Sequence, residues 1–325
     1  MSNNILFQFE EVKREKCKAS ILIEGLTGKG KSGLALVLGY ALANHDWSKV
    51  YNIDTENKSI QLFEGLESTS GVKFEKFKIA NFTPELGYKP SNYEAFKKSA
   101  IATGAEVIIQ DSISHAWQYQ GGVLDMINEL KKSNKRYERD PYAAWGDEKI
   151  VKEKQKLFQL FRDPNCHIIS TVRVKEKMEY DKDASGKTVL NSLGEQEIMQ
   201  ADIKYEPDCV LHMIKPGKRT RTEASYPVAK VVKSRYAILT EGEQYEFTPQ
   251  LCDQIREYLE EGTAPEILLE QQRLQYVDGI KEFLDTNEPA RNVWNALKQD
   301  RGLKDVALKD LNLKDLKEMF VTLTV

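Results

Sequence analysis

The sequence has few cysteines and histidines, and neither type is grouped. Its four cysteines, Cys17, Cys166, Cys209 and Cys252, lie far apart and form no C-x-x-C pair, so we predict neither a zinc site nor a redox pair. The four histidines are equally dispersed, and we assign none of them as a metal ligand. Lone cysteines without a signal peptide are typical of a reducing compartment, so we expect a cytoplasmic protein.

Long apolar runs and a strong net charge are also missing. No apolar run is as long as the roughly 18 residues that a membrane-spanning helix needs, so no contact with a membrane is expected. The net charge is −3 over 325 residues, so any contact with nucleic acid must depend on local charge. A hydrophobic content of 41% with 30% charged residues is typical of a globular protein of one large or two smaller domains.

A glycine-rich loop is the most informative stretch that the sequence does contain. Residues 25–32 read G-L-T-G-K-G-K-S, which matches the P-loop pattern G-x-x-x-x-G-K-[ST]. A run of strand type, 19–24, precedes the loop, and an apolar run long enough for a buried helix, 33–43, follows it. Glycines let successive backbone N–H groups point at a phosphate, and the helix N-terminus favours its negative charge. The predicted nucleotide-binding residues are Gly25, Leu26, Thr27, Gly28, Lys29, Gly30, Lys31, Ser32 and Gly33.

Three residues have specific tasks in such a site. Lys31 can reach the β- and γ-phosphates of ATP, and the Ser32 hydroxyl can bind Mg²⁺. Asp111 ends a run in which three consecutive β-branched residues, 107–109, predict a buried parallel strand. P-loop proteins use a carboxylate at such a strand end to hold Mg²⁺. We therefore assign Ser32 and Asp111 as metal ligands, the alternative for Asp111 being a helix cap.

Predicted strands and helices alternate after the P-loop, which indicates an α/β fold with a doubly wound, mostly parallel sheet. Strands are expected at 5–9, 19–24, 49–56, 105–112, 166–172, 208–214 and 228–233, with a hairpin over 173–190 that turns at 183–186. Helices are expected at 33–43, 91–103, 113–130, 147–162 and 249–261, whereas 57–90 is expected to be irregular.

The last fifth of the chain differs from the rest because it has no strand pattern and no motif. Residues 262–265 resemble a linker, so we predict an ATPase core over 1–262 and a helical C-terminal tail over 263–325. Helices are expected in the tail at 266–284, 290–300 and 313–323, with Trp294 and Leu297 in a small core.

Other strand ends resemble those of the RecA/RadA recombinase family. The run Ile53-Asp54-Thr55-Glu56 is similar to the family's I-D-[AT]-E element, and the run 109–112 resembles its hydrophobic run ending in Asp-Ser. In that family the Glu polarises the water that attacks the γ-phosphate, which implies that Glu56 is the catalytic carboxylate. Thr171 stands where the family usually has a γ-phosphate-sensing Gln, and its hydroxyl can also bond a phosphate oxygen.

A further element resembles the K-x-R motif of RadA-type and ring-helicase ATPases. It consists of Lys233, Ser234 and Arg235 at the end of a predicted strand. In those families the Lys and Arg reach the nucleotide of a neighbouring subunit, where cations stabilise charge on the transferring phosphoryl group. The resemblance implies that Lys233 and Arg235 act in a homo-oligomer, a ring or a filament; the alternative is an exposed strand end.

The chain also resembles the short RecA-core ATPases encoded by bacteriophages, through the run 111–117, Trp145-Gly146 and the strand end 171–175. The resemblance covers residues 18–262, and it implies a role beside annealing or single-strand DNA-binding proteins, in the host cytoplasm. In RecA-like proteins two loops, which follow the Asp-Ser strand and the sensor strand, touch DNA. Tyr137 offers a stacking face in the first of them. The predicted DNA-binding residues in the corresponding stretches are Lys131, Lys132, Lys135, Arg136, Arg139, Arg173, Lys175 and Lys177.

These observations lead to one functional hypothesis and its rivals. We expect a RecA-like ATPase that uses ATP and Mg²⁺ and binds single-stranded DNA in phage-type recombination, annealing or replication. The first alternative is a helicase or helicase-loader ATPase. The second is a nucleotide-dependent switch or assembly protein that does not bind DNA. A small-molecule kinase is disfavoured because no lid with several arginines is evident.

Overall fold

The computed structural model describes residues 13–56, 58–83, 85–140, 142–182, 188–219, 224–263 and 265–324. Two compact units account for the chain. The larger is Cys17–Leu259, and the smaller consists of the segments up to Lys16 and from Glu260 onwards. The edge strand expected at 5–9 and the turn expected at 183–186 lie outside the described residues.

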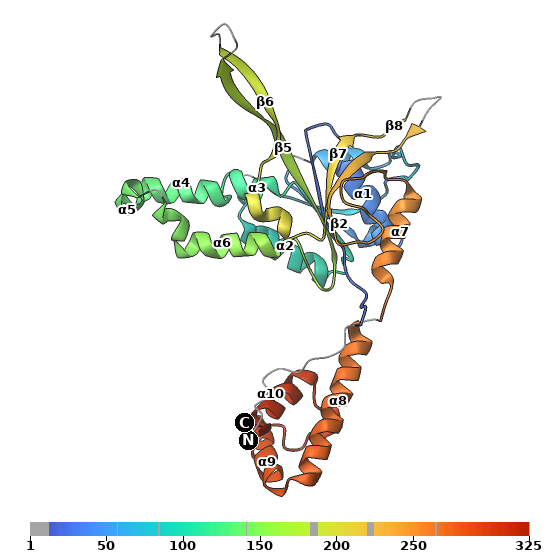
Figure 1. Ribbon diagram of the computed structural model, residues 1–325, viewed down its shortest axis with the longest axis vertical. Helices are drawn as coiled ribbons and strands as arrows, with labels where there is room; N and C mark the ends of the chain where they lie inside the picture. The colour runs from blue at the N-terminus through green and yellow to red at the C-terminus, as the bar shows by residue number, and fades with distance from the viewer. Residues whose placement is uncertain are drawn as a thin grey trace. The chain divides into compact units, whose positions relative to one another are not determined.

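The larger unit is built on one sheet with the strand order β11-β10-β7-β1-β5-β4-β2-β3, to which β6 is joined through β5 (Figure 1). The strands from β7 to β3 in this order run parallel, whereas β10 pairs antiparallel with both of its neighbours, β7 and β11. The strands are β1 Ser20–Gly25, β2 Val50–Asp54, β3 Lys78–Asn81, β4 Val107–Asp111, β5 His167–Lys182, β6 Thr188–Glu197, β7 Cys209–Lys215, β10 Val228–Ser234 and β11 Gln244–Glu246. A separate pair consists of β8 Lys218–Arg219 and β9 Ala224–Ser225.

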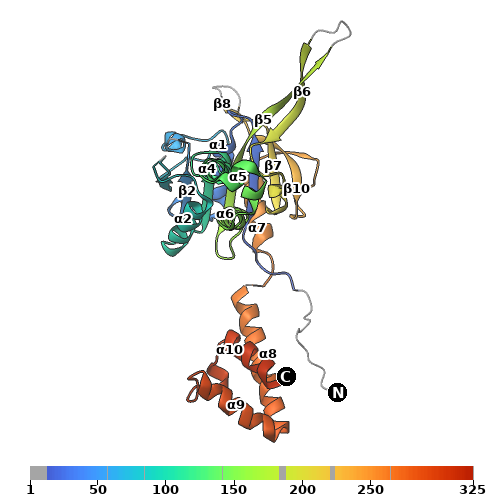
Figure 2. The same ribbon diagram turned by 90° about the vertical axis from the view of Figure 1, so that its left-hand side faces the viewer.

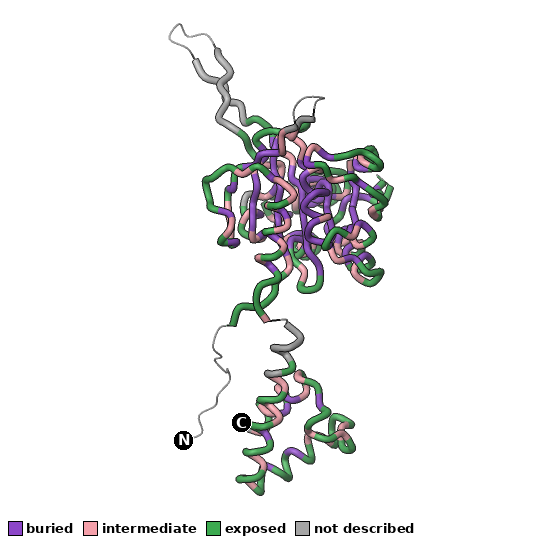
Figure 3. The backbone as a smooth tube through the Cα atoms, turned by 90° about the vertical axis from the view of Figure 1, so that its right-hand side faces the viewer, coloured by how far each residue is buried: buried purple, intermediate pink, exposed green. Residues whose placement is uncertain are grey.

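Apolar residues on both faces of the central strands explain why the sheet is covered on both sides. Along β1, Ile21 and Ile23 belong to one core cluster and Leu22 to the other, because side chains alternate between the two faces of a strand. Helices α1 and α7 contribute to the first cluster, and α2 and α6 to the second. Figure 3 shows the buried residues concentrated along the central strands. The predicted fold class, a doubly wound and mostly parallel α/β sheet, is confirmed.

The helices of this unit agree with the predicted positions except over 113–139, where a single helix was expected at 113–130 and none at 135–139. They are α1 Lys31–Leu42, α2 Pro90–Ala102, α3 Ser114–Gln118, α4 Val123–Ser133, α5 Lys135–Arg139, α6 Glu148–Gln159 and α7 Pro249–Glu260. Short 3-10 helices lie at η1 Trp47–Lys49, η2 Ser59–Phe63, η3 Ala143–Gly146 and η4 Ala201–Tyr205. The helix expected at 113–130 is divided into α3 and α4. A Cβ on Gly122 would lie 2.7 Å from the carbonyl oxygen of His115, and Gly121 has a φ of +76°, so the chain folds back here.

The second difference is strand β3, which lies in the stretch expected to be irregular. It pairs in parallel with β2, Ile79 opposite Asn52. Only four residues make up the strand, so its sequence carries almost no periodicity. Its pairing with β2 is a tertiary effect.

Two parts of the larger unit extend beyond the sheet. The strands β5 and β6 continue as a long antiparallel hairpin, and α4, α5 and α6 form a helical projection (Figures 1 and 2). The hairpin that the sequence predicted over 173–190 is therefore present, although residues 183–187 at its turn are not described.

The smaller unit contains the helices α8 Pro265–Thr286, α9 Glu288–Asp300 and α10 Leu313–Thr324, with a 3-10 helix, η5 Leu308–Asp310, between the last two. They match the three helices predicted for the tail. Their core consists of Ile280, Trp294, Leu311, Leu316 and Met319, and Leu297 packs against it. Among the described residues, no helix is long and apolar enough to cross a membrane.

Candidate nucleotide-binding site

The carboxyl ends of four neighbouring parallel strands bring the predicted site residues to one edge of the sheet. In the register of the sheet, Gly25 at the end of β1 lies opposite Arg173 on β5, and Asp54 at the end of β2 lies opposite Asp111 at the end of β4. Open α/β sheets bind their ligands at this edge. The P-loop, Asp111, Thr171 and Glu56 therefore share one location, although their sequence positions span 25 to 171.

The backbone of the P-loop has the conformation that the glycines were expected to allow. Gly28 and Gly30 have φ values of +79° and +85°, in the left-handed region that favours glycine. A Cβ on Gly30 would also lie 3.2 Å from Cβ of Pro216. Helix α1 begins directly after Gly30, at Lys31, so its N-terminal N–H groups open toward the loop.

Lys31 lies inside the loop that it belongs to. Its Nζ donates to the carbonyl oxygens of Gly25 and Leu26, at 2.9 and 3.0 Å. Burial lowers the pKa of Lys31, and the nearby carboxylates of Glu56 and Asp111 oppose this shift. A phosphate would offer Lys31 a charged partner in place of two carbonyl oxygens.

Asp111 has the surroundings of a metal ligand. Burial raises its pKa, which the neighbouring hydroxyls of Ser32 and Thr171 oppose. Its Oδ1 accepts a hydrogen bond from Thr171, whereas its buried Oδ2 has no hydrogen-bond partner among the described residues. A buried carboxylate oxygen without a donor costs free energy, and a hard cation such as Mg²⁺ would satisfy it. Ser32 and Asp111 therefore fit the predicted metal site.

Thr171 is fully buried and directs its hydroxyl to Asp111. The sequence predicted that this hydroxyl senses the γ-phosphate. In the structure it fixes one oxygen of the carboxylate, which leaves the other oxygen for a cation. The sensing role of Thr171 stays a prediction.

Glu56 lies at the same edge and is paired with Arg173. Nε of Arg173 donates to Oε1 of Glu56 at 2.7 Å, and Nη1 donates to the Tyr119 hydroxyl at 2.9 Å. Arg173 was expected in a DNA-binding loop. Its side chain instead turns to the predicted catalytic carboxylate, because Arg173 is still within the parallel part of β5, beside Gly25.

The sequence did not predict the buried hydrogen bonds that Thr55, the residue before Glu56, makes with Ser112 and His115. The Thr55 hydroxyl accepts a hydrogen bond from N of Ser112 at 2.8 Å, and it lies 2.6 Å from Nδ1 of His115. Burial, reinforced by the charge of Arg173, lowers the pKa of His115 to about 4, so the imidazole is neutral at pH 7. These contacts fix the ends of β2 and β4 against each other. The available signal was the position of His115, four residues after the strand end at Asp111.

Lys233 and Arg235 lie at the opposite edge of the sheet from the P-loop of the same chain. Ser234 pairs with Cys209, the first residue of β7, whereas the P-loop edge is at the end of that strand. Nζ of Lys233 donates to the carbonyl oxygens of Lys204, Tyr205 and Pro207 at 2.7–3.0 Å. Arg235 pairs with Asp208 at 2.6 Å. Both cations thus have partners within this chain, and their action on a neighbouring subunit stays a prediction.

The basic residues predicted to touch DNA lie in two places. Lys131, Lys132, Lys135, Arg136 and Arg139 are on α4 and α5, in the helical projection, and Lys175 is exposed on β5. The side chain of Lys177 lies outside the described residues.

Tyr137 is not a free stacking platform. Its hydroxyl donates to Asp147 at 2.8 Å, and its ring packs against the second core cluster. DNA binding by the surrounding cations stays a prediction.

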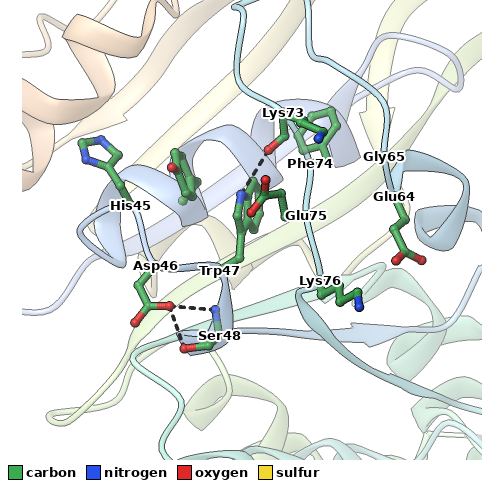
Figure 4. Close-up of a pocket in the computed structure, with 11 residues that line it drawn as sticks. His45, Asp46, Trp47, Ser48, Glu64, Gly65, Lys73, Phe74, Glu75 and Lys76 are labelled. Atoms are coloured by element: carbon green, nitrogen blue, oxygen red, sulfur yellow. Dashed lines mark hydrogen bonds between the residues drawn. The ribbon is translucent and has the colours of Figure 1, made fainter.

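A separate hollow of about 570 Å³ lies at the far end of α1. Figure 4 shows His45, Asp46 and Trp47 on one side of it and Lys73, Phe74, Glu75 and Lys76 on the other. Trp47 Nε1 donates to the carbonyl oxygen of Lys73 at 3.1 Å. Because the P-loop is at the start of α1 and this hollow is near its end, the two are distinct.

Comparison with family models and with curated proteins gives no match. Among solved structures, the chain is similar to the flagellar accessory protein FlaH from Methanocaldococcus jannaschii, at 16% identity and a TM-score of 0.38, over 72% of this chain and 86% of that one. It is also similar to the KaiC-like protein PH0186 from Pyrococcus horikoshii OT3, at 13% identity and a TM-score of 0.37, over 73% of this chain and 94% of that one. The fold class of this chain is therefore assigned from its own strand order and from the position of its P-loop, and not from these two similarities.

Proposed function

We propose that this chain is a RecA-like ATPase that hydrolyses ATP with Mg²⁺ at the P-loop edge of its sheet. The observation that supports this most directly is the meeting of five residues from four strand ends. They are Lys31, Ser32, Glu56, Asp111 and Thr171. Their residue types match the needs of phosphoryl transfer, which depends on positioning and charge stabilisation.

The roles of these residues follow from their positions. The P-loop N–H groups and Lys31 would hold the phosphates, and Ser32 with Oδ2 of Asp111 would hold Mg²⁺, which neutralises charge on the phosphates. Glu56 would orient and polarise the attacking water. For that task its carboxylate must separate from Arg173. The ion pair at 2.7 Å would therefore have to break before hydrolysis.

We further propose that the protein binds single-stranded DNA and serves phage-type recombination, annealing or replication. The support is the resemblance of the motifs and the basic residues of α4 and α5. ATP binding would set the assembly of subunits and their grip on DNA, and hydrolysis would release it.

One observation favours a second candidate, a nucleotide-dependent assembly protein without DNA. The segment from Arg173 to Glu197, which forms most of the β5–β6 hairpin, carries five basic and six acidic residues. A polyanion is attracted by an excess of basic residues, and this hairpin has none. If DNA binds, the α4–α5 cations are therefore better placed to hold it than the hairpin is.

The test is the rate of ATP hydrolysis with and without single-stranded DNA, with Lys31→Ala as the control for contaminating activity. The proposal predicts hydrolysis that requires Mg²⁺, is stimulated by DNA and is lost in Lys31→Ala. Hydrolysis without DNA binding would favour the second candidate. Equal rates in wild type and Lys31→Ala would reject the site.

A further inference from the structure

A group of charged side chains lies beside the P-loop strand and has no part in the proposed hydrolysis. Glu24 directly precedes Gly25, and its side chain is 3% exposed. Charged side chains are rarely buried this deeply unless they are paired. The other members of the group, which come from three different elements, are Glu195, Glu197, Lys204 and His212.

His212 on β7 lies between two carboxylates. Its Nδ1 is 3.1 Å from Oε1 of Glu24, and its Nε2 is 3.2 Å from Oε2 of Glu195. A neutral imidazole has only one N–H, whereas the charged form donates from both nitrogens. Both contacts are therefore hydrogen bonds only when His212 is protonated.

Lys204 on η4 makes a second connection of the same kind. Its Nζ lies 3.0 Å from Oε2 of Glu24 and also pairs with Glu197. Burial works against the charge of Lys204, but its bonds to Glu197 and Glu24 outweigh this and raise its pKa. Lys204 and, when it is protonated, His212 thus share one buried carboxylate at the end of the P-loop strand.

The outer carboxylates belong to the base of the hairpin. Glu195 and Glu197 are on β6, where Glu197 lies opposite Val174 and N of Ile198 donates to the carbonyl oxygen of Arg173 at 2.8 Å. This is also the part of β5 from which Arg173 reaches Glu56. The two cations consequently join the P-loop strand to the base of the hairpin.

We propose that His212 and Lys204 form an ionic clamp between Glu24 and the base of β6, and that His212 is a positioning residue whose protonation closes this clamp. The evidence for the clamp is the set of contacts among Glu24, Glu195, Glu197, Lys204 and His212. Only its influence on turnover, through Arg173 and Glu56, rests on the proposed ATPase function.

The direction of the pH dependence follows from the groups around His212. Glu24 on β1 and Glu195 on β6 favour its charged form, whereas Lys204 on η4 opposes it; Lys230, opposite on β10, is exposed. The hydrogen bond to Glu24 outweighs burial and raises the pKa of His212 above its usual 6.5. The clamp is therefore complete below about pH 6.5 and weakens as the pH rises through the higher pKa of the folded protein.

Hydrogen exchange of the full chain between pH 6 and 9, corrected for intrinsic exchange rates, tests the clamp without any nucleotide. In the wild type, opening of the backbone at 173–176 and 195–198 should increase about tenfold for each unit by which the pKa of His212 is raised. His212→Gln should open readily at every pH. The matched control is His45→Gln, which removes a histidine paired with Asp253 at 2.8 Å and should keep the wild-type profile. A wild-type profile that is flat, or that His212→Gln shares, overturns the proposal.

A second measurement covers the case in which His212→Gln does not fold. Glu195→Gln removes only the outer carboxylate, and it should lower the pKa of His212 measured by NMR titration. The signal of His212 can be recognised among the four histidines. Burial lowers the pKa values of His115 and His167 to about 4 and about 3, and the signal of His45 is the one that disappears in His45→Gln. An unchanged titration of His212 in Glu195→Gln rejects the clamp. If the clamp shows the expected pH dependence but the protein does not hydrolyse ATP, the proposed function is rejected and the clamp is not.

Discussion

At the scale of single residues, Glu56 and Arg173 decide how the site can work. Their ion pair joins the predicted catalytic carboxylate to a side chain that the sequence had assigned to DNA. Arg173 is about one quarter exposed, as is Glu56, so an anion from solution can compete for the guanidinium. This contact gives a physical route by which a bound polyanion would free Glu56.

Arg173→Ala tests this route. Without the guanidinium, Glu56 is free in the absence of DNA, so basal ATP hydrolysis should rise by up to about fivefold, which corresponds to the roughly 1 kcal/mol that a partly exposed ion pair contributes. Stimulation by single-stranded DNA should shrink accordingly. The control is Lys175→Ala, two residues along the same strand and exposed. A fall in basal turnover would show that Arg173 supports catalysis directly.

Asp111 allows a test in which stability and activity move in opposite directions. Its pKa is raised by burial, so the ionised form is penalised in the fold, and the loss of stability builds up as the pH rises above the usual pKa of an aspartate and is complete above the raised pKa of the folded protein. Asp111→Asn should therefore raise the free energy of unfolding at pH 7 by about 1–2 kcal/mol while abolishing Mg²⁺-dependent hydrolysis. Urea denaturation and turnover assays check the two effects. Lower stability of the variant at pH 7 would contradict this account of the site.

At the scale of elements, the central strands carry the stability of the larger unit. Leu22 on β1 is completely buried, whereas Leu62 is 76% exposed. Leu22→Ala should lower the free energy of unfolding by about 2–5 kcal/mol through lost burial and a cavity. The same change at Leu62 should cost less than about 0.5 kcal/mol. Denaturation curves of the two variants make a direct comparison, and similar costs would show that β1 is not central.

The strands and helices of the core could be predicted because their signals are local. The P-loop at 25–32 and the β-branched run at 107–109 each lie within a short window of sequence. The pairs around the site could not be predicted this way. His212 lies 188 residues from Glu24, and Arg173 lies 117 residues from Glu56. Such contacts depend on the register of the sheet, which the sequence pattern does not specify.

At the scale of the whole molecule, the predicted homo-oligomer would share each active site between two subunits. Lys233 and Arg235 bind groups of their own chain, at the edge away from its P-loop. Mixing Arg235→Ala with Glu56→Gln chains tests sharing, because some interfaces would then combine an intact Glu56 with an intact Arg235. Partial recovery of ATP hydrolysis is expected if the trans-acting assignment is right. If mixed oligomers form but hydrolysis does not recover, Arg235 does not act on a neighbouring subunit, and its ion pair with Asp208 is its role in the fold.

The central claim is that the P-loop edge binds Mg²⁺-ATP and that Glu56 activates the attacking water. Titration calorimetry of Glu56→Gln with ATP, with and without Mg²⁺, beside a turnover assay, tests both halves in one protein. The amide keeps the shape of the side chain but cannot polarise water, a function worth about 10²- to 10⁴-fold in rate. The account predicts Mg²⁺-dependent ATP binding close to that of the wild type, with turnover reduced by that factor. Absent binding, or hydrolysis at the wild-type rate, would contradict it.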